Sequence, residues 1–118
     1  MGNKNTSKEE ERRLARKLQD VFPDAQRNFE DRVGAGYDIE NTDPFRFQLK
    51  YGHQPSPYKA LEEAVGAADD TEYGVGVCRF RYEARKDPEN KRKSLEFAVL
   101  RLDDLIELLG MLKQEKIL

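Results

Sequence analysis

The chain has 118 residues, a length that fits one compact domain with a core of its own. Apolar and charged residues each make up 37% of it, and the apolar ones recur in periodic runs, so we expect disorder only over residues 1–6 and a single domain over 7–118. The single cysteine, Cys78, excludes an internal disulfide and a cysteine-rich zinc site. No apolar stretch approaches the ~20 residues of a membrane span and no signal-peptide pattern opens the chain, so we expect a soluble, cytoplasmic protein.

The charges are unevenly distributed along the chain. The formal net charge of −2 is unusual for a dedicated nucleic-acid binder. Acidic residues concentrate in 62–72 and 103–107, however, which permits a basic face elsewhere on the molecule, although each basic cluster could equally be a solvated surface. The basic clusters are Arg12, Arg13, Arg16 and Lys17, and then Arg85, Lys86, Lys91, Arg92 and Lys93.

The first predicted element is a helix. Ser7 and Glu10 have the spacing of a capping box, with Ser7 as the N-cap, and apolar residues then recur at helical spacing up to Phe22. Pro23 ends this helix. A short strand is expected over 26–29, followed by a loop.

Two alternating segments follow. Residues 37–40 alternate apolar and acidic side chains, and residues 45–50 alternate apolar and polar ones, which is the period of a half-buried strand. The residues between them, 41–44, have the composition of a turn. The two segments therefore predict a β-hairpin.

The second half predicts a helix, two strands and a last helix. Ser56 followed by Pro57 is an N-cap followed by proline at the first helical position, and this helix should run to about residue 68. Strands are expected over 73–82 and 95–101. The last helix should begin with Asp103 as its cap and turn an apolar face inward. The element order is then α-β-β-β-α-β-β-α, an α/β fold with a mixed sheet flanked by helices. The residues expected to face inward on the last helix are Leu105, Ile106, Leu109 and Leu112.

One set of polar residues in the hairpin has the composition of a reactive site. Gln48 and Lys50 share a face of their strand, and burial of the phenylalanines favours the register in which Asp38 lies opposite Gln48, or one shifted by two residues. An acid, an amide oxygen and an ammonium group would then lie within a few ångströms of one another. Oxygen ligands of this kind hold Mg²⁺, and a nearby lysine can position or deprotonate a water that attacks a phosphodiester.

These residues carry a resemblance to a known family. Gly36-Tyr37-Asp38-Ile39-Glu40 followed by Phe45-Arg46-Phe47-Gln48-Leu49-Lys50 resembles the D-x(n)-(E/Q)-x-K core of the PD-(D/E)xK nuclease superfamily, and the Q-x-K form is similar to that of Mrr-type restriction enzymes. Over residues 7–113 the chain resembles the archaeal-type Holliday-junction resolvases and their phage-encoded relatives, in which a helix with an early glutamate precedes the hairpin and a helix and further strands follow.

The resemblance implies a restriction-endonuclease-like fold and a Mg²⁺-dependent endonuclease, with Mn²⁺ able to substitute, that cuts branched DNA such as four-way junctions. Two paired cuts imply a homodimer, and no small-molecule cofactor or membrane partner is implied. Asp38 and Gln48 would ligate the metal and Lys50 would serve the attacking water. Glu9, Glu10 and Glu11 are all candidates for the helix glutamate, and Glu11 is preferred because it shares the inward face of the leucines that follow.

Two departures from the family pattern leave other functions open. Tyr37 stands where the motif has proline, and Gln48 replaces the acid, which would weaken metal binding. Alternatives are a restriction- or repair-type nuclease acting on duplex or flap DNA, and an inactive nuclease-fold protein that binds DNA or a protein. Sequence-independent contacts to the DNA backbone are expected from Arg12, Arg13, Arg46, His53, Arg85, Lys86, Lys91, Arg92 and Lys93.

Overall fold

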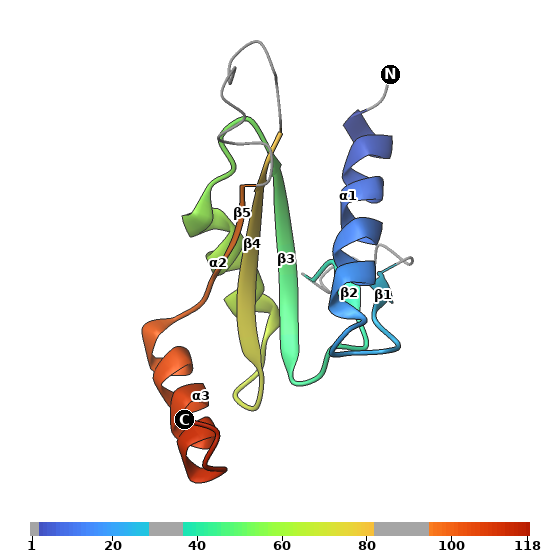
Figure 1. Ribbon diagram of the computed structural model, residues 1–118. Helices are drawn as coiled ribbons and strands as arrows, with labels where there is room; N and C mark the ends of the chain where they lie inside the picture. Colours follow the sequence, from blue (N-terminus) through green and yellow to red (C-terminus); the bar gives the residue numbers. More distant parts are fainter. Residues whose placement is uncertain (1–2, 29–36, 82–94) are drawn as a thin grey trace.

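The computed structural model of the chain describes residues 3–28, 37–81 and 95–118 (Figure 1). The chain forms three helices and five strands within these ranges. In chain order they are α1 (Asn3–Leu18), β1 (Gln26–Arg27), β2 (Ile39–Glu40), β3 (Phe45–Gly52), α2 (Pro57–Ala67), β4 (Tyr73–Phe80), β5 (Glu96–Val99) and α3 (Leu102–Gln114).

The central feature is a mixed three-stranded sheet with the strand order β3-β4-β5. β3 and β4 are parallel, with Gln48 opposite Gly76 and Lys50 opposite Cys78, and β5 runs antiparallel to β4. Parallel neighbours need a crossover connection, and α2 provides it. The expectation of an α/β fold with helices around a mixed sheet is confirmed.

The hairpin prediction is wrong in its pairing. β2 pairs with β1 in a separate two-stranded antiparallel sheet, with Ile39 opposite Arg27, and not with β3. Asp38 precedes β2, and its backbone N–H donates to the carbonyl of Phe47 at 2.8 Å. The two alternating segments therefore meet without forming a regular ladder, because the strand before Asp38 supplies the partner that the sequence pattern assigned to β3.

The capping box at the start of α1 is also wrong. The helix begins at Asn3, four residues before Ser7, so Ser7 lies inside the helix and residues 3–6 are helical. Glu10 is not a capping residue here. Its carboxylate forms ion pairs with Arg13 at 3.0 Å and with Arg79 of β4 at 2.7 Å, so it ties the helix to the sheet.

Of the other two predicted helix starts, one is confirmed and one is wrong. α2 begins as predicted, because Ser56 Oγ accepts the N–H of Lys59 at 3.2 Å and Pro57 occupies the first turn. α3 begins after Arg101, which makes no side-chain capping bond, and Asp103 lies in the first helical turn rather than at the cap. An acidic residue is favourable in that turn as well, because the positive end of the helix dipole lies there.

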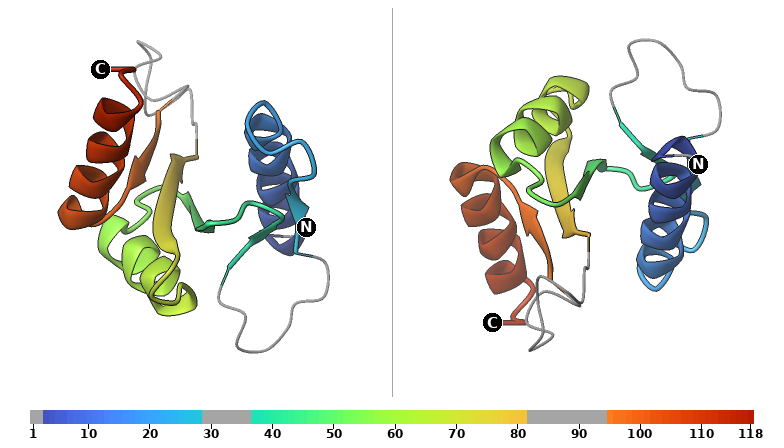
Figure 2. Two further views of the ribbon diagram at one scale, coloured as in Figure 1. Left: turned by 90° about the horizontal axis from the view of Figure 1, so that it is seen from below. Right: turned by 90° about the horizontal axis from the view of Figure 1, so that it is seen from above.

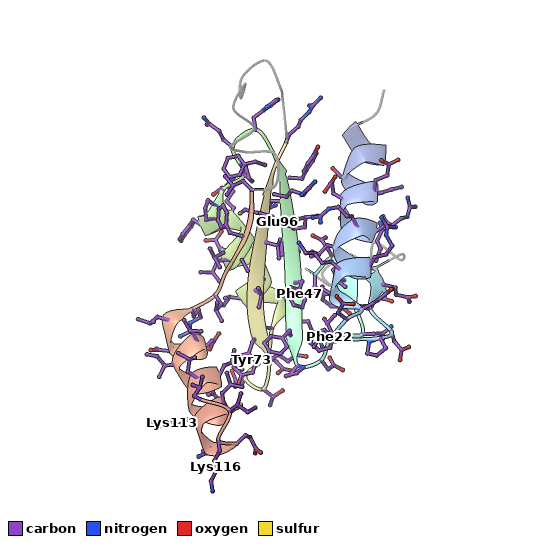
Figure 3. All side chains as sticks on the ribbon, viewed as in Figure 1. Phe22, Phe47, Tyr73, Glu96, Lys113 and Lys116 are labelled. Atoms are coloured by element: carbon purple, nitrogen blue, oxygen red, sulfur yellow. The ribbon has the colours of Figure 1, made fainter. Side chains whose placement is uncertain are left out.

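The main core lies between α1 and the sheet. Leu14 and Ala15 of α1 are 5% and 3% exposed, and they pack in one cluster with Phe47, Leu49 and the fully buried Ile39. Figure 2 shows α1 with the β1–β2 pair on one side of β3, and α2 and α3 on the other. Phe47 and Phe22 are visible in the layer between α1 and β3 (Figure 3).

α2 packs closely on the other face of β4. A Cβ atom added at Gly74 would lie 2.5 Å from the backbone nitrogen of Val65, and one added at Gly76 would lie 2.7 Å from the backbone of Ala60. Ala60 and Ala64 are fully buried at this contact. The glycines thus let the helix backbone approach the strand, which fixes where the outer residues of α2 lie relative to β3.

α3 differs from both other helices, because it buries none of its residues. The predicted inward face is wrong, since Leu105, Ile106, Leu109 and Leu112 are 37% to 56% exposed. α3 lies at one end of the sheet, beside the start of β4 (Figure 1). None of the helices in the described part of the chain has both the length and the apolar character needed to cross a membrane.

Candidate functional site

Asp38 lies at the outer edge of the sheet, against β3. Its Oδ2 accepts the backbone N–H of Leu49 at 2.7 Å, while its own N–H donates to Phe47 and its carbonyl accepts the N–H of Asn28. Strand N–H groups point sideways in the plane of the sheet, so the Asp38 carboxylate sits beside the strand rather than on one face of it. It takes the place of a carbonyl from a missing neighbouring strand, directly beside Gln48.

The Asp38 carboxyl has a strongly perturbed acidity. Burial raises its pKa to about 7, and the nearby Glu11 carboxylate adds to the increase. The N–H of Leu49 and the ammonium group of Lys50 act in the opposite direction. Perturbed acids of this kind are frequent in functional sites, because burial and neighbouring charge are the means by which a site tunes its groups.

Glu11 reaches this carboxyl from α1, as the preferred choice among the three glutamates requires. Its Oε1 accepts the Nε–H of Arg27 at 2.8 Å, and Arg27 is only 6% exposed. Glu9 is exposed, and Glu10 pairs with Arg13 and with Arg79 of β4 instead. The buried guanidinium therefore holds Glu11 in place beside Asp38, and two carboxyl groups share this position.

Gln48 points to the α2 face of β3. Its Nε2 donates to Glu63 of α2 across 3.4 Å. Its amide oxygen, Oε1, is buried, and no donor in the described ranges reaches it. A buried carbonyl oxygen without a partner costs free energy, so such a group suggests that a ligand completes the site.

Lys50 lies on the same face and binds the same acid. Its Nζ is 2.6 Å from Oε2 of Glu63, so one carboxylate contacts both polar residues of the Gln48-x-Lys50 pair. Sequence reasoning missed Glu63, which it grouped with an acidic surface stretch. The contact depends on the close packing of α2 against β4, and the only signal in the sequence was the pair of glycines that permit this packing.

The site is therefore a chain of charged and polar groups that runs around the edge of β3. The carboxylate and amide oxygens in it are hard donors of the kind that Mg²⁺ and Mn²⁺ prefer, and the Gln48 oxygen is buried without a partner among the described residues. Within residues 3–28, 37–81 and 95–118, no three histidine, cysteine, aspartate or glutamate side chains gather closely enough to hold a metal. A cation here would therefore need the amide oxygen. The chain consists of Arg27, Glu11, Asp38, Lys50, Glu63 and Gln48.

The expected DNA contacts differ in availability. Arg12 is exposed on α1 and lines a surface pocket of about 220 Å³ together with Arg16 and Arg27. This pocket adjoins the Glu11–Arg27 pair and offers exposed guanidinium groups to a phosphate backbone.

Two other arginines are engaged within the protein. Arg13 pairs with Glu10 and with Glu96 of β5. Arg46 pairs with Asp43 and Glu72, and its guanidinium carbon lies 5.1 Å from the centre of the Tyr37 ring. Both side chains hold elements together, so a DNA contact from either would compete with these ion pairs.

Of the remaining expected DNA contacts, only His53 lies within the described residues. His53 is exposed just after β3, beyond Lys50. The second basic cluster, Arg85, Lys86, Lys91, Arg92 and Lys93, lies outside the described residues.

Comparisons of the chain with models of protein families, with curated proteins and with solved structures gave no match. The function is therefore inferred from the geometry of the site itself.

Proposed function

We propose that this chain is a metal-dependent endonuclease of the PD-(D/E)xK type that hydrolyses DNA phosphodiesters, with four-way junctions as its preferred substrate. The observation that carries the proposal is the series of contacts along β3 that links Glu11 to Asp38, Asp38 to Lys50, and Lys50 through Glu63 to Gln48, whose amide oxygen is buried without a donor among the described residues. The element order, with a glutamate-bearing helix before the Asp38 segment and a helix and strands after Lys50, also supports it.

Each residue has a role that its contacts suit. Asp38, Glu11 and Gln48 would hold the cation, and a cation bound there would polarise the phosphate and lower the pKa of a bound water. Arg27 keeps Glu11 in place through the 2.8 Å ion pair. Lys50, whose ammonium charge is close enough to lower the pKa of Asp38, would orient the attacking water and stabilise charge on the phosphate.

Glu63 supplies the acid that the Gln48 position lacks. It anchors the Lys50 ammonium with one oxygen and the Gln48 amide nitrogen with the other, so the Gln48 carbonyl oxygen is turned away from α2. We assign it the role of a positioning residue. The carboxylate charge that a glutamate at position 48 would bring is thus present in the site, supplied by a different element of the fold.

Junction cleavage beside a linear duplex of the same sequence tests the proposal, with Mg²⁺ or Mn²⁺ as the cation. Wild type should cut the junction in paired positions, and Asp38→Asn should lower the rate at least about 100-fold while keeping DNA binding, because it removes an anionic ligand near the phosphates. Equal cutting of the duplex would favour a restriction- or repair-type nuclease. Retained cleavage by Asp38→Asn would show that the site is elsewhere.

Glu63→Gln tests the positioning role. It should slow cleavage about tenfold or more, since both Lys50 and Gln48 lose a charged anchor, and it should change the pH profile of the rate. Glu62→Gln is the matched control, because Glu62 is the exposed neighbour on the same helix. Equal rates for the two variants would remove Glu63 from the mechanism.

A second candidate function is DNA binding without cleavage. It is favoured by the absence, among the described residues, of a three-acid cluster and by glutamine at position 48. No cleavage of junction or duplex by wild type with either cation, together with retained junction binding, would establish this function in place of the nuclease.

A further inference from the structure

Asn28, just after β1, has a buried side chain with one polar atom that lacks a partner. The residue is only 7% exposed. Its Nδ2 donates to the carbonyl of Tyr37 at 3.2 Å, which fixes the orientation of the amide group. The other end of the amide, Oδ1, is buried, and no donor in the described ranges reaches it. A buried oxygen without a hydrogen bond requires an explanation, and a bound ion is one of the few that fit.

The register of the β1–β2 pair places this amide beside Asp38. Gln26 lies opposite Glu40, and two residues further along the N–H of Asn28 donates to the carbonyl of Asp38 at 2.8 Å. Residues directly opposite each other in an antiparallel pair project their side chains to the same face. Gln26 and Glu40 do so, since Nε2 of the glutamine donates to Oε2 of the glutamate at 3.1 Å. Asn28 and Asp38 therefore share that face, with an amide oxygen next to a carboxylate.

The acids at this position can accept a further partner. Oδ2 of Asp38 accepts only one N–H, from Leu49 at 2.7 Å, among the hydrogen bonds of the described residues, and a carboxylate has room for about four. The Glu11 carboxylate is nearby, held by its ion pair with Arg27. Two carboxylates and a neutral amide oxygen, with water completing the shell, are a donor set that suits Mg²⁺ or Mn²⁺. No third acid, histidine or cysteine joins the two acids within the described ranges, so a third protein donor is a neutral oxygen, and Asn28 provides one.

We propose that Asn28 is a further ligand of the cation at Asp38, which it binds through Oδ1 together with the carboxylates of Asp38 and Glu11. The inference rests on the cation site of the proposed function and adds to it a residue from β1. Asn28 supplies a neutral oxygen on the β1 side of Asp38, whereas the Gln48 amide is held by Glu63 on the α2 side of β3. The β1–β2 pair, which lies beside β3 in Figure 2, thus takes part in the site directly.

A purely structural role explains only half of the Asn28 side chain. The bond from Nδ2 to Tyr37 and the backbone bond to Asp38 hold the end of β1 against the Asp38 segment. They leave Oδ1 without water and without a donor among the described residues, which costs free energy. A cation removes that cost, and the Nδ2 bond holds the amide in one orientation, as the outer hydrogen bonds of metal ligands do.

Titration of the whole chain with Mn²⁺ in the absence of DNA, followed by calorimetry, tests the ligand. Asn28→Leu, of similar size, should lower the affinity for Mn²⁺ about tenfold, because it removes an oxygen donor. Asn28→Asp should raise it about tenfold, because it adds a charge to the donor set. Gln26→Leu is the matched control and should leave the affinity unchanged, since this amide is on the same strand but is exposed and pairs with Glu40.

Thermal unfolding of the same variants separates a ligand from a structural residue. In chelator, Asn28→Asp should unfold at a lower temperature than wild type, because a third carboxylate joins two others and faces the carbonyl of Tyr37. Saturating Mn²⁺ should raise its unfolding temperature by more than it raises that of wild type. An equal loss with and without Mn²⁺ would show a structural role only.

The outcomes for Asn28 and for the nuclease are distinct. Equal Mn²⁺ affinity of wild type and Asn28→Leu would overturn the role of Asn28 and leave the nuclease proposal standing. If Asn28→Leu does not fold, failure of Asn28→Asp to bind Mn²⁺ more tightly than wild type overturns it instead. A wild type that binds no Mn²⁺ would overturn the inference whether or not it cuts DNA. Mn²⁺ binding that depends on Asn28, in a protein that cuts neither junction nor duplex, would uphold the ligand and overturn the nuclease.

Discussion

The first and last helices carry the same kind of apolar stripe, yet only one of the two stripes is buried. Leu14 of α1 is 5% exposed and packs against β3, whereas Leu109 of α3 is 41% exposed. Both helices have leucines at the spacing that predicts an inward face. The difference shows that periodicity identifies an apolar face but does not identify what covers it.

What a helix packs against depends instead on the shape of the surface that faces it. α2 packs tightly because β4 provides Gly74 and Gly76 at the contact, and these leave no room for a Cβ atom. A Cβ atom added at Gly110 of α3 would meet no atom within 4 Å, so nothing in the described part of the protomer approaches that side of the last helix. A strand whose glycines leave room for a helix backbone, rather than the apolar pattern of the helix itself, thus determines which helix face is buried.

The largest expected difference is in stability, between a leucine-to-alanine change in α1 and one in α3. Leu14→Ala should destabilise the protein by about 2 to 5 kcal/mol, because it leaves a cavity in the main core. Leu109→Ala should destabilise the protein by less than about 1 kcal/mol in dilute solution, because this side chain is exposed to water. Urea unfolding at low protein concentration gives both values. Equal losses would mean that α3 packs against the body in solution.

The same substitution at two glycines should give opposite signs. Gly76→Ala should destabilise by about 2 kcal/mol, since the added Cβ would meet the backbone of α2 at 2.7 Å. Gly110→Ala should stabilise by up to about 1 kcal/mol, because alanine favours the helix and the space is open. Thermal unfolding of the two variants measures this difference. A neutral Gly76→Ala would show that α2 can move away from β4 without cost.

The smallest expected effect is a pH-dependent change in stability at the buried acid Asp38, compared with an exposed acid on α3. Because the pKa of Asp38 is raised to about 7, its contribution to stability is complete below about pH 4 and is lost as the pH rises through 7. Asp38→Asn should therefore be more stable than wild type at pH 8 by about 1 kcal/mol or more, and this advantage should vanish near pH 4. Thermal unfolding at both pH values measures the change.

Asp103→Asn on α3 is the control for that experiment, and it should change stability by less than about 1 kcal/mol at either pH. Mg²⁺ at pH 8 should raise the unfolding temperature of wild type, a chelator should reverse this, and Asp38→Asn should respond to neither. An Asp38→Asn variant that is less stable than wild type at pH 8 would contradict the assigned burial of the carboxylate.

Much of the fold was predictable from local sequence. Ser56 and Pro57 start α2 as expected, and the alternation around Phe47 identifies β3, since both signals act within a few residues. The start of α1 was not predictable from the capping box, because helical residues precede Ser7. The pairing of β2 with β1 instead of β3 was missed because a strand of two residues gives almost no periodic signal.

The candidate site was predictable only within a segment. The spacing of Gln48 and Lys50 on one strand face follows from the two-residue period, and the inward position of Glu11 follows from the leucines after it. The contact of Glu63 with both residues of β3 could not be read in this way. It depends on a parallel crossover and on the depth to which α2 packs, which are properties of the three-dimensional fold.

The position of Asp38 has a consequence for the solubility of the fold. β3 is an edge strand, and an edge strand with free N–H and C=O groups is a template on which strands of other molecules can aggregate. Asp38 occupies two of these groups, the carbonyl of Phe47 and the N–H of Leu49, in the middle of the strand. Its carboxylate also brings a charge to a surface that another strand would have to approach. Asp38, which we propose as a metal ligand, thus also disfavours the pairing of β3 with strands of other molecules.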